Sequence, residues 1–130
     1  LRPGKRNMST DACVPIEKLT EIILETKRDI DETGLPAPIA GHVGDGNFHL
    51  GIVFDPTDPD EAERAEGLAF RVSRRAIAMG GTCSGEHGIG LHKTVHMELE
   101  HGPALAVMRA IKQTLDPKGL MNPGKMLPPA

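Results

Sequence analysis

An Asp-Gly pair between two segments that can form strands is the feature that most constrains this chain. Asp45-Gly46 is a strong signal for a tight β-hairpin turn. A two-residue loop at this pair places His42 opposite His49, and a four-residue loop gives the same pairing. The sequence therefore predicts an antiparallel hairpin that carries two histidines on one face.

The opposite face of the predicted hairpin carries apolar side chains. They are Ile39, Val43, Phe48, Leu50, Ile52 and Phe54. The side chains on the histidine face are small, namely Ala40, Gly51 and Val53. They leave room for a ligand or for another domain. We therefore expect an α+β fold in which helices cover one face of an antiparallel sheet.

A second glycine-rich stretch, SGEHGIG, places Glu86 and His87 side by side in the sequence. Neighbouring side chains of an extended segment point to opposite sides, so one residue could bind a metal while the other acts on a substrate. Two imidazoles and one carboxylate form a common ligand set for zinc or manganese, with one position open for water or substrate. We predict a divalent-metal site at His42, His49 and Glu86.

Simpler interpretations of the same residue types exist. Many histidines lie on surfaces or make one structural hydrogen bond. We assign that role to His92, His96 and His101. Neither glycine-rich stretch is a nucleotide-binding loop, because GEHGIG lacks the Lys-Ser/Thr ending of a phosphate loop and GDGN lacks the spacing of a dinucleotide fingerprint.

Apolar residues at helical spacing predict three helical regions. They cover residues 16–32, 59–79 and 92–116. Asp58 followed by Pro59 suits the start of the second region, and Gly102-Pro103 is expected to break the third. The buried face of the third region is expected to be Leu105, Met108, Ile111 and Leu115. Short strands are also expected at 11–14 and 82–84, after a polar lead over 1–8.

Size and composition exclude several classes of protein. The 130 residues fit one domain that can bury a core. A net charge of −3, with three Phe and no Trp or Tyr, argues against a nucleic-acid partner. No apolar run approaches the roughly 20 residues that span a bilayer. Cys13 and Cys83 form no CxxC motif, which favours free thiols in a reducing cytosol or mitochondrial matrix.

Four ordered motifs resemble the C-terminal domain of FAD-linked 2-hydroxy-acid dehydrogenases: TDACVPI, GHVGDGNFH, GTCSGEHGIG and LDPKGLMNPGK. The resemblance runs from about Thr10 to Leu127 and is strongest to cytochrome-type D-lactate dehydrogenases. The flavin subunit of glycolate oxidase and D-2-hydroxyglutarate dehydrogenase share the layout. The resemblance implies that the chain is part of the ferredoxin-like cap domain of a vanillyl-alcohol-oxidase-type flavoprotein. Residues 1–130 would be the latter part of that cap, with the FAD-binding domain absent, so the fragment alone should be inactive.

The resemblance also implies roles for individual residues. His42, His49 and Glu86 resemble the metal ligands of the family, and His87 resembles its base beside the flavin. Asn122 lies in the tail motif that approaches FAD. The metal would hold the carboxylate and the 2-hydroxyl of a D-2-hydroxy acid while His87 removes the hydroxyl proton and hydride passes to the flavin. Electrons would then leave to an acceptor such as cytochrome c or a quinone.

Two further residues bear on the substrate. Asn47 suits a tight turn because Asn tolerates positive φ, and a contact with the substrate is its alternative role. Where a 2-hydroxyglutarate enzyme carries an Asn, this chain has Gly51, which favours a smaller acid such as D-lactate. Glycolate and D-2-hydroxyglutarate are the alternative substrates.

Two alternatives belong to other functional classes. The chain could be a free-standing metal-binding module without a flavin, or a structural domain that self-associates as a homo-oligomer through an exposed cap surface. For the dehydrogenase we expect a cytoplasmic protein, with a peripheral position on the inner membrane as the alternative, and a mitochondrial protein in a eukaryote.

Overall fold

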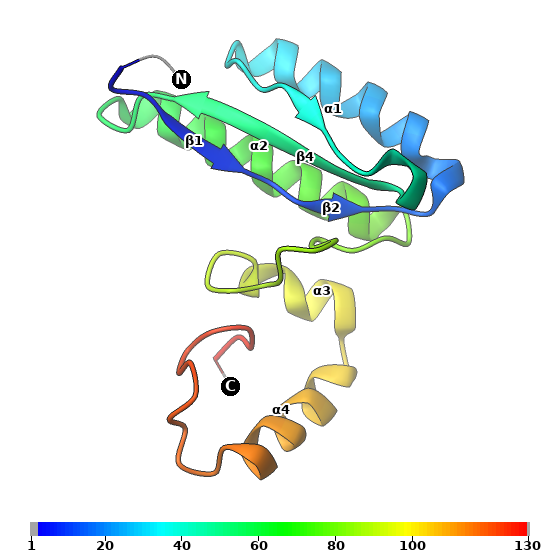
Figure 1. Cartoon of the computed structure of the whole chain (residues 1–130), viewed down its shortest axis with the longest axis vertical. Helices are drawn as coiled ribbons and strands as arrows, with labels where there is room; N and C mark the ends of the chain where they lie inside the picture. Colours follow the sequence, from blue (N-terminus) through cyan, green and yellow to red (C-terminus); the bar gives the residue numbers. More distant parts are fainter. Residues whose placement is uncertain (1–2, 130) are drawn as a thin grey trace. The chain divides into compact units, whose positions relative to one another are not determined.

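The computed structural model describes residues 3–129 as two compact units (Figure 1). The first unit runs to Glu86 and the second starts at His87. An antiparallel sheet with helices on one face forms the first unit, and the second consists of short helices and loops. The predicted α+β class is therefore confirmed.

Strand β4 (Asn47–Phe54) is the centre of the sheet. Strands β1 (Arg6–Ser9) and β2 (Ala12–Cys13) pair with it in succession along one edge. Strand β3 (Ile39–Ala40) pairs with it along the other edge. All three pairings are antiparallel. Because each of them is with β4, this one long strand organises the sheet.

The first edge strand continues in a single register from β1 into β2. Arg6 pairs with Phe54 and Ala12 with Phe48, and the two residues between the strands, Thr10 and Asp11, interrupt the ladder. The expected polar lead over 1–8 is wrong for the residues in β1, while residues 1 and 2 lie outside the described part. Strand β1 has one apolar side chain, Met8, among polar and mostly exposed ones, so it has no apolar alternation from which to predict it.

The turn between β3 and β4 differs from the predicted hairpin loop. Ala40, and not His42, pairs with His49, because residues 43–45 form a short 3-10 helix. The Asn47 N–H donates to the His42 carbonyl oxygen (3.3 Å) across this turn. A Cβ at Gly41 would lie 2.5 Å from the Asn47 carbonyl oxygen, so glycine is required there. The predicted register was therefore wrong by two residues.

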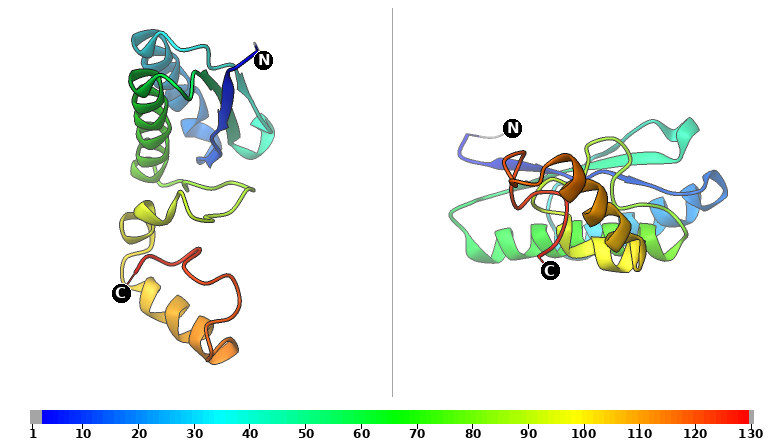
Figure 2. Two further views of the ribbon diagram at one scale, coloured as in Figure 1. Left: turned by 90° about the vertical axis from the view of Figure 1, so that its left-hand side faces the viewer. Right: turned by 90° about the horizontal axis from the view of Figure 1, so that it is seen from below.

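The core lies between β4 and two helices that cover one face of the sheet (Figure 2). Phe48, Leu50, Ile52 and Phe54 alternate along β4 and are buried, as predicted. Val43, predicted for the same face, is exposed because it lies in the 3-10 turn and not in a strand.

The two helices of the first unit have clear end signals. Helix α1 (Leu19–Thr33) follows a 3-10 turn over 16–18 and ends at Gly34, whose φ is +67°. Helix α2 (Pro59–Ala78) begins after Asp58, whose side chain accepts hydrogen bonds from the second and third N–H groups. Their predicted ranges, 16–32 and 59–79, are confirmed to within a few residues.

The second unit contains helices α3 (Met97–His101) and α4 (Ala104–Leu115). The predicted break at Gly102-Pro103 is confirmed. The predicted buried face is only partly right, because Leu105 is buried whereas Ile111 and Leu115 are exposed. Within residues 3–129, no helix combines the length and the apolar character that crossing a membrane requires.

Candidate functional site

His42 and His49 meet at the end of the sheet although they are not paired. His42 directly precedes the 3-10 turn, and His49 projects from β4 on the side away from the core. Their ring centroids lie 6.3 Å apart and the ring planes are nearly perpendicular. A shift of two residues keeps a side chain on the same face of a strand. The predicted closeness of the two rings therefore holds even though the predicted register does not.

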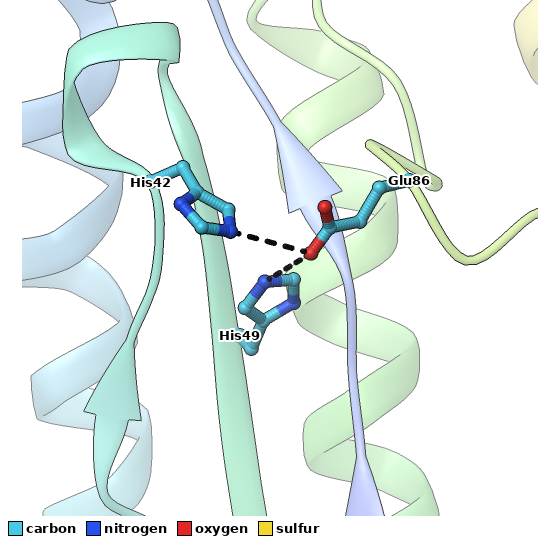
Figure 3. A group of neighbouring side chains, drawn as sticks. All are labelled: His42, His49 and Glu86. Atoms are coloured by element: carbon cyan, nitrogen blue, oxygen red, sulfur yellow. Dashed lines mark ion pairs between the residues drawn. The ribbon is translucent and has the colours of Figure 1, made fainter.

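Glu86 completes a cluster with the two histidines (Figure 3). Its Oε1 lies 3.0 Å from His49 Nε2 and 3.8 Å from His42 Nε2. One ligand atom from each residue lies within 4.8 Å of the other two. The side chain of His49 is 18 % exposed, while His42 is 66 % and Glu86 47 % exposed. The cluster is thus anchored by His49 and open toward His42 and Glu86.

The spacing of these atoms fits a divalent ion. Nitrogen and oxygen ligands about 2.0–2.2 Å from an ion lie about 3–3.6 Å from each other. The 3.0 Å contact between His49 and Glu86 falls in this range, and the 3.8 Å contact to His42 needs only a small side-chain rotation. Two imidazoles and one carboxylate are ligands that both zinc and manganese accept.

The hydrogen bonds of His49 favour the same conclusion. Its Nδ1 lies 3.3 Å from the Thr10 carbonyl oxygen and 3.5 Å from Asp11 Oδ1. A carbonyl and a carboxylate oxygen only accept, so Nδ1 carries a proton, and in the neutral ring Nε2 presents a lone pair. That lone pair faces Glu86 Oε1, which is also an acceptor. A cation between the two atoms, or a second proton on the ring, must balance them.

Asp11 contacts the segments that carry two of the cluster residues, strand β4 and the loop at residues 84–86. Its side chain is completely enclosed. Oδ1 accepts from Asn47 Nδ2 (2.9 Å), and Oδ2 accepts from the Ser84 hydroxyl (3.1 Å) and from the Glu86 N–H (2.9 Å). Neither Asp11 nor Ser84 is predicted from the sequence to have a functional role. The sequence signal that could have identified Asp11 is an acidic residue at the start of the otherwise apolar segment Asp11–Val14.

Asn47 is buried in this network. Its Nδ2 donates to Asp11 Oδ1 and to the Ala12 carbonyl oxygen (3.2 Å). Its Oδ1 is buried without a hydrogen-bond partner among residues 3–129. Asn47 therefore supports the Asp11 carboxylate, and its predicted contact with the substrate stays a prediction.

His87 and Asn122 belong to the second unit. His87 is exposed and directly follows Glu86 in the chain. Asn122 is exposed, has a φ of +46°, and accepts a hydrogen bond from Lys125 Nζ (3.3 Å) through Oδ1. The predicted roles of His87 as a base and of Asn122 as a contact of FAD stay predictions.

Residues 1–126 match the family model of the C-terminal domain of FAD linked oxidases. The chain is 56 % identical over 128 residues to a probable mitochondrial D-lactate dehydrogenase of Danio rerio, which covers 98 % of this chain and 26 % of the relative. It is 45 % identical over 130 residues to the mitochondrial D-lactate dehydrogenase [cytochrome] of Arabidopsis thaliana, covering 99 % and 23 %.

A further relative carries a different name. The glycolate oxidase subunit GlcD of Escherichia coli K12 is 35 % identical over 119 residues, which cover 91 % of this chain and 24 % of the relative. The chain therefore spans about a quarter of the length of these curated relatives. The match over nearly all of its residues shows that the chain belongs to the family of FAD-linked oxidase C-terminal domains.

Proposed function

We propose that this chain is the metal- and substrate-binding part of an FAD-dependent dehydrogenase that oxidises D-lactate to the 2-oxo acid. The convergence of His42, His49 and Glu86 is the observation that carries the proposal. The relatives named D-lactate dehydrogenase support this substrate. Glycolate is the second candidate, because another relative is named a glycolate oxidase subunit. The FAD-binding domain would lie outside these residues.

The three clustered residues are proposed to bind zinc or manganese. His49 would contribute Nε2, which the hydrogen bonds at Nδ1 direct toward Glu86. The exposure of His42 and Glu86 leaves one side of the site open to the carboxylate and 2-hydroxyl of a small acid. A bound divalent cation would neutralise the substrate carboxylate and lower the pKa of its hydroxyl group.

His87 is proposed to accept the proton of the substrate hydroxyl. A neutral imidazole is a suitable general base near neutral pH, and the exposed position of His87 allows a substrate to reach it. FAD, when bound, supplies the acceptor for the hydride that leaves the substrate Cα. His87 would thus hold the proton of the substrate hydroxyl, and a bound FAD would supply the hydride acceptor that formation of the 2-oxo acid requires.

Gly51 and Asn122 are proposed to affect binding of the substrate and of FAD. Gly51 lies two residues beyond His49 on the same strand face, and the side-chain amide of Asn7 occupies the space beside it. Gly51 offers no polar side chain to bind a second carboxylate, which favours a small acid over a dicarboxylic one. Asn122 would approach FAD through its amide, which is exposed in the tail.

The electron acceptor and the location of the protein follow the names of the relatives. The Arabidopsis thaliana relative is named a mitochondrial D-lactate dehydrogenase [cytochrome], and the Danio rerio relative is named a probable mitochondrial D-lactate dehydrogenase. A cytochrome is therefore the proposed acceptor and the mitochondrion the proposed location, with a quinone as the alternative acceptor.

Flavin reduction in the full-length protein tests this proposal. D-lactate added without oxygen should bleach the flavin, and removal of the metal by a chelator should slow bleaching until Zn²⁺ or Mn²⁺ is restored. Glycolate added in parallel distinguishes the two candidate substrates. Bleaching that is equally fast after complete metal removal would contradict the role of the cluster.

Matched histidine variants separate the two proposed roles. His49→Ala should lose bound metal and bleach slowly. His87→Ala should keep its metal and still bleach slowly, because loss of a general base costs about 10²–10⁴-fold in rate. His92→Ala, at another exposed histidine of the second unit, is the control and should bleach at the wild-type rate.

A further inference from the structure

The buried Asp11 carboxylate has no part in the proposed reaction. Only 1 % of this residue is exposed, and it lies in the interruption between β1 and β2, so it pairs with no strand. Removing a carboxylate from water is costly unless hydrogen bonds replace the lost water. The strand pairing of the sheet therefore does not explain why a carboxylate is buried at this position.

The partners of Asp11 are donors from two separate segments, strand β4 and the loop at residues 84–86. Oδ1 faces Asn47 Nδ2 at 2.9 Å and His49 Nδ1 at 3.5 Å, both from β4. Oδ2 accepts from the Ser84 hydroxyl and from the Glu86 N–H, 73 and 75 residues further along the chain. One carboxylate therefore joins the strand that carries His49 to the loop that carries Glu86.

We propose that Asp11 is a positioning residue for the metal centre, a step that rests on the proposed metal site. Through Oδ1, together with the Thr10 carbonyl oxygen, it holds the His49 ring with Nδ1 protonated, so that Nε2 faces the ion. Through Oδ2 it accepts from the Glu86 N–H and so holds the Glu86 backbone at one position, from which the side chain can reach the ion. Carboxylates that hold metal-binding histidines in this way raise metal affinity, and their loss weakens binding about 10- to 100-fold.

The loop at residues 84–86 is built to reach this carboxylate. A Cβ at Gly85 would lie 3.0 Å from Asp11 Oδ1 and would overlap the Asn47 amide. Glycine therefore lets the loop backbone approach closely enough for the Glu86 N–H to reach Oδ2.

The chemistry of the partners requires a carboxylate and not an amide. The Glu86 N–H and Asn47 Nδ2 can only donate. An asparagine at position 11 has one acceptor oxygen, so its NH₂ group would face a donor on one side or the other. Asp11→Asn keeps the size of the side chain and removes either the contact with β4 or the contact with the loop.

Calorimetric titration of Zn²⁺ into the metal-free full-length protein tests the proposal. Asp11→Asn should bind Zn²⁺ about 10- to 100-fold more weakly than wild type. Asp45→Asn removes one negative charge from an exposed residue in the turn after His42, and it should bind like wild type. His49→Ala, which removes a ligand, measures the metal site itself.

The ring state of His49 gives a readout that general destabilisation would not produce. In ¹⁵N-histidine NMR spectra of the Zn²⁺ form, His49 should have Nε2 bound and Nδ1 protonated. In Asp11→Asn the ring should populate more than one arrangement. The wild-type spectrum is decisive even if Asp11→Asn does not fold, because zinc bound through Nδ1 would overturn the proposal.

The remaining outcomes separate this inference from the metal site on which it rests. If wild type binds Zn²⁺, His49→Ala does not, and Asp11→Asn equals wild type, Asp11 has no positioning role while the metal site stands. If His49→Ala binds Zn²⁺ as tightly as wild type, the metal site is wrong and the role of Asp11 falls with it.

Discussion

Replacing Gly46 by alanine tests whether the turn that holds His42 depends on close contact with the segment before α1. Gly46 has a φ of +74°, and a Cβ there would overlap the Val14 carbonyl group. The Val14 N–H also donates to the Gly46 carbonyl oxygen at 3.0 Å. Alanine must therefore adopt a left-handed conformation and also push the two segments apart.

The expected cost follows from these two effects. A left-handed conformation costs an alanine about 1–2 kcal/mol, of which about 0.4–1 kcal/mol is recovered because the unfolded chain loses freedom. Loss of the hydrogen bond to Val14 adds about 0.5–1.5 kcal/mol. With displacement of the buried Val14, Gly46→Ala should lower the free energy of unfolding by about 2–3 kcal/mol.

Gly80→Ala is the matched control, because Gly80 has a φ of +79° and open space where its Cβ would be. It should cost only about 1 kcal/mol. Urea unfolding of the chain, followed by far-UV circular dichroism, measures both variants. Zn²⁺ affinity should fall in Gly46→Ala alone, because only that variant displaces the turn of His42. Equal costs, or unchanged Zn²⁺ affinity in Gly46→Ala, would refute the role given to this contact.

Three further predictions concern the stability of each unit. The hydrogen bond from Lys112 lowers the pKa of Asp116 from its ordinary value of 3.8 to about 2. The hydrogen bonds from the Leu120 and Met121 N–H groups to the Asp116 carboxylate should thus be fully formed above pH 4 and be lost toward pH 2. Protection of these two amides against hydrogen exchange, corrected for the intrinsic rate, measures this, and protection that does not change over this range would contradict it. Leu68→Ala, in the core, should cost about 2–5 kcal/mol in urea unfolding, and a loss below 1 kcal/mol would mean that the site can repack. Asp58→Ala removes the N-cap of α2 and should cost about 0.5–2 kcal/mol, whereas Asp58→Asn should retain most of that stability.

The elements that the sequence predicted well are those with local signals. Asp58 and Pro59 mark the start of α2, and Gly34 marks the end of α1, without help from distant residues. The apolar alternation of β4 likewise predicts which side chains enter the core. Such signals depend on the backbone within a few residues, so the sequence alone is enough to locate them.

The hairpin register depended on contacts that no local pattern reveals. The Val14 N–H bonds to Gly46, and β2 pairs with the start of β4, so a segment more than 30 residues earlier in the chain shapes the turn. The error of two residues left His49 on its predicted face, because side chains alternate with a period of two. The candidate ligands therefore lie together as predicted although the register was wrong. The same error made the predicted burial of Val43 wrong.

Asp11 illustrates the other limit of the sequence. An acid near a strand is normally solvated, and only the packing of Asn47, Ser84 and the Glu86 backbone around it makes Asp11 a buried acceptor. The predicted burial of Ile111 and Leu115 fails for a related reason. Their spacing defines an apolar helix face, but spacing does not say whether another part of the described chain covers it.

Counting metal ions per flavin in the purified full-length protein tests the central claim most directly. Wild type should contain one divalent ion for each FAD. Glu86→Ala should retain FAD but lose the ion, together with rapid bleaching by D-lactate. A wild-type protein that holds FAD, is bleached rapidly by D-lactate and contains no metal would contradict the account.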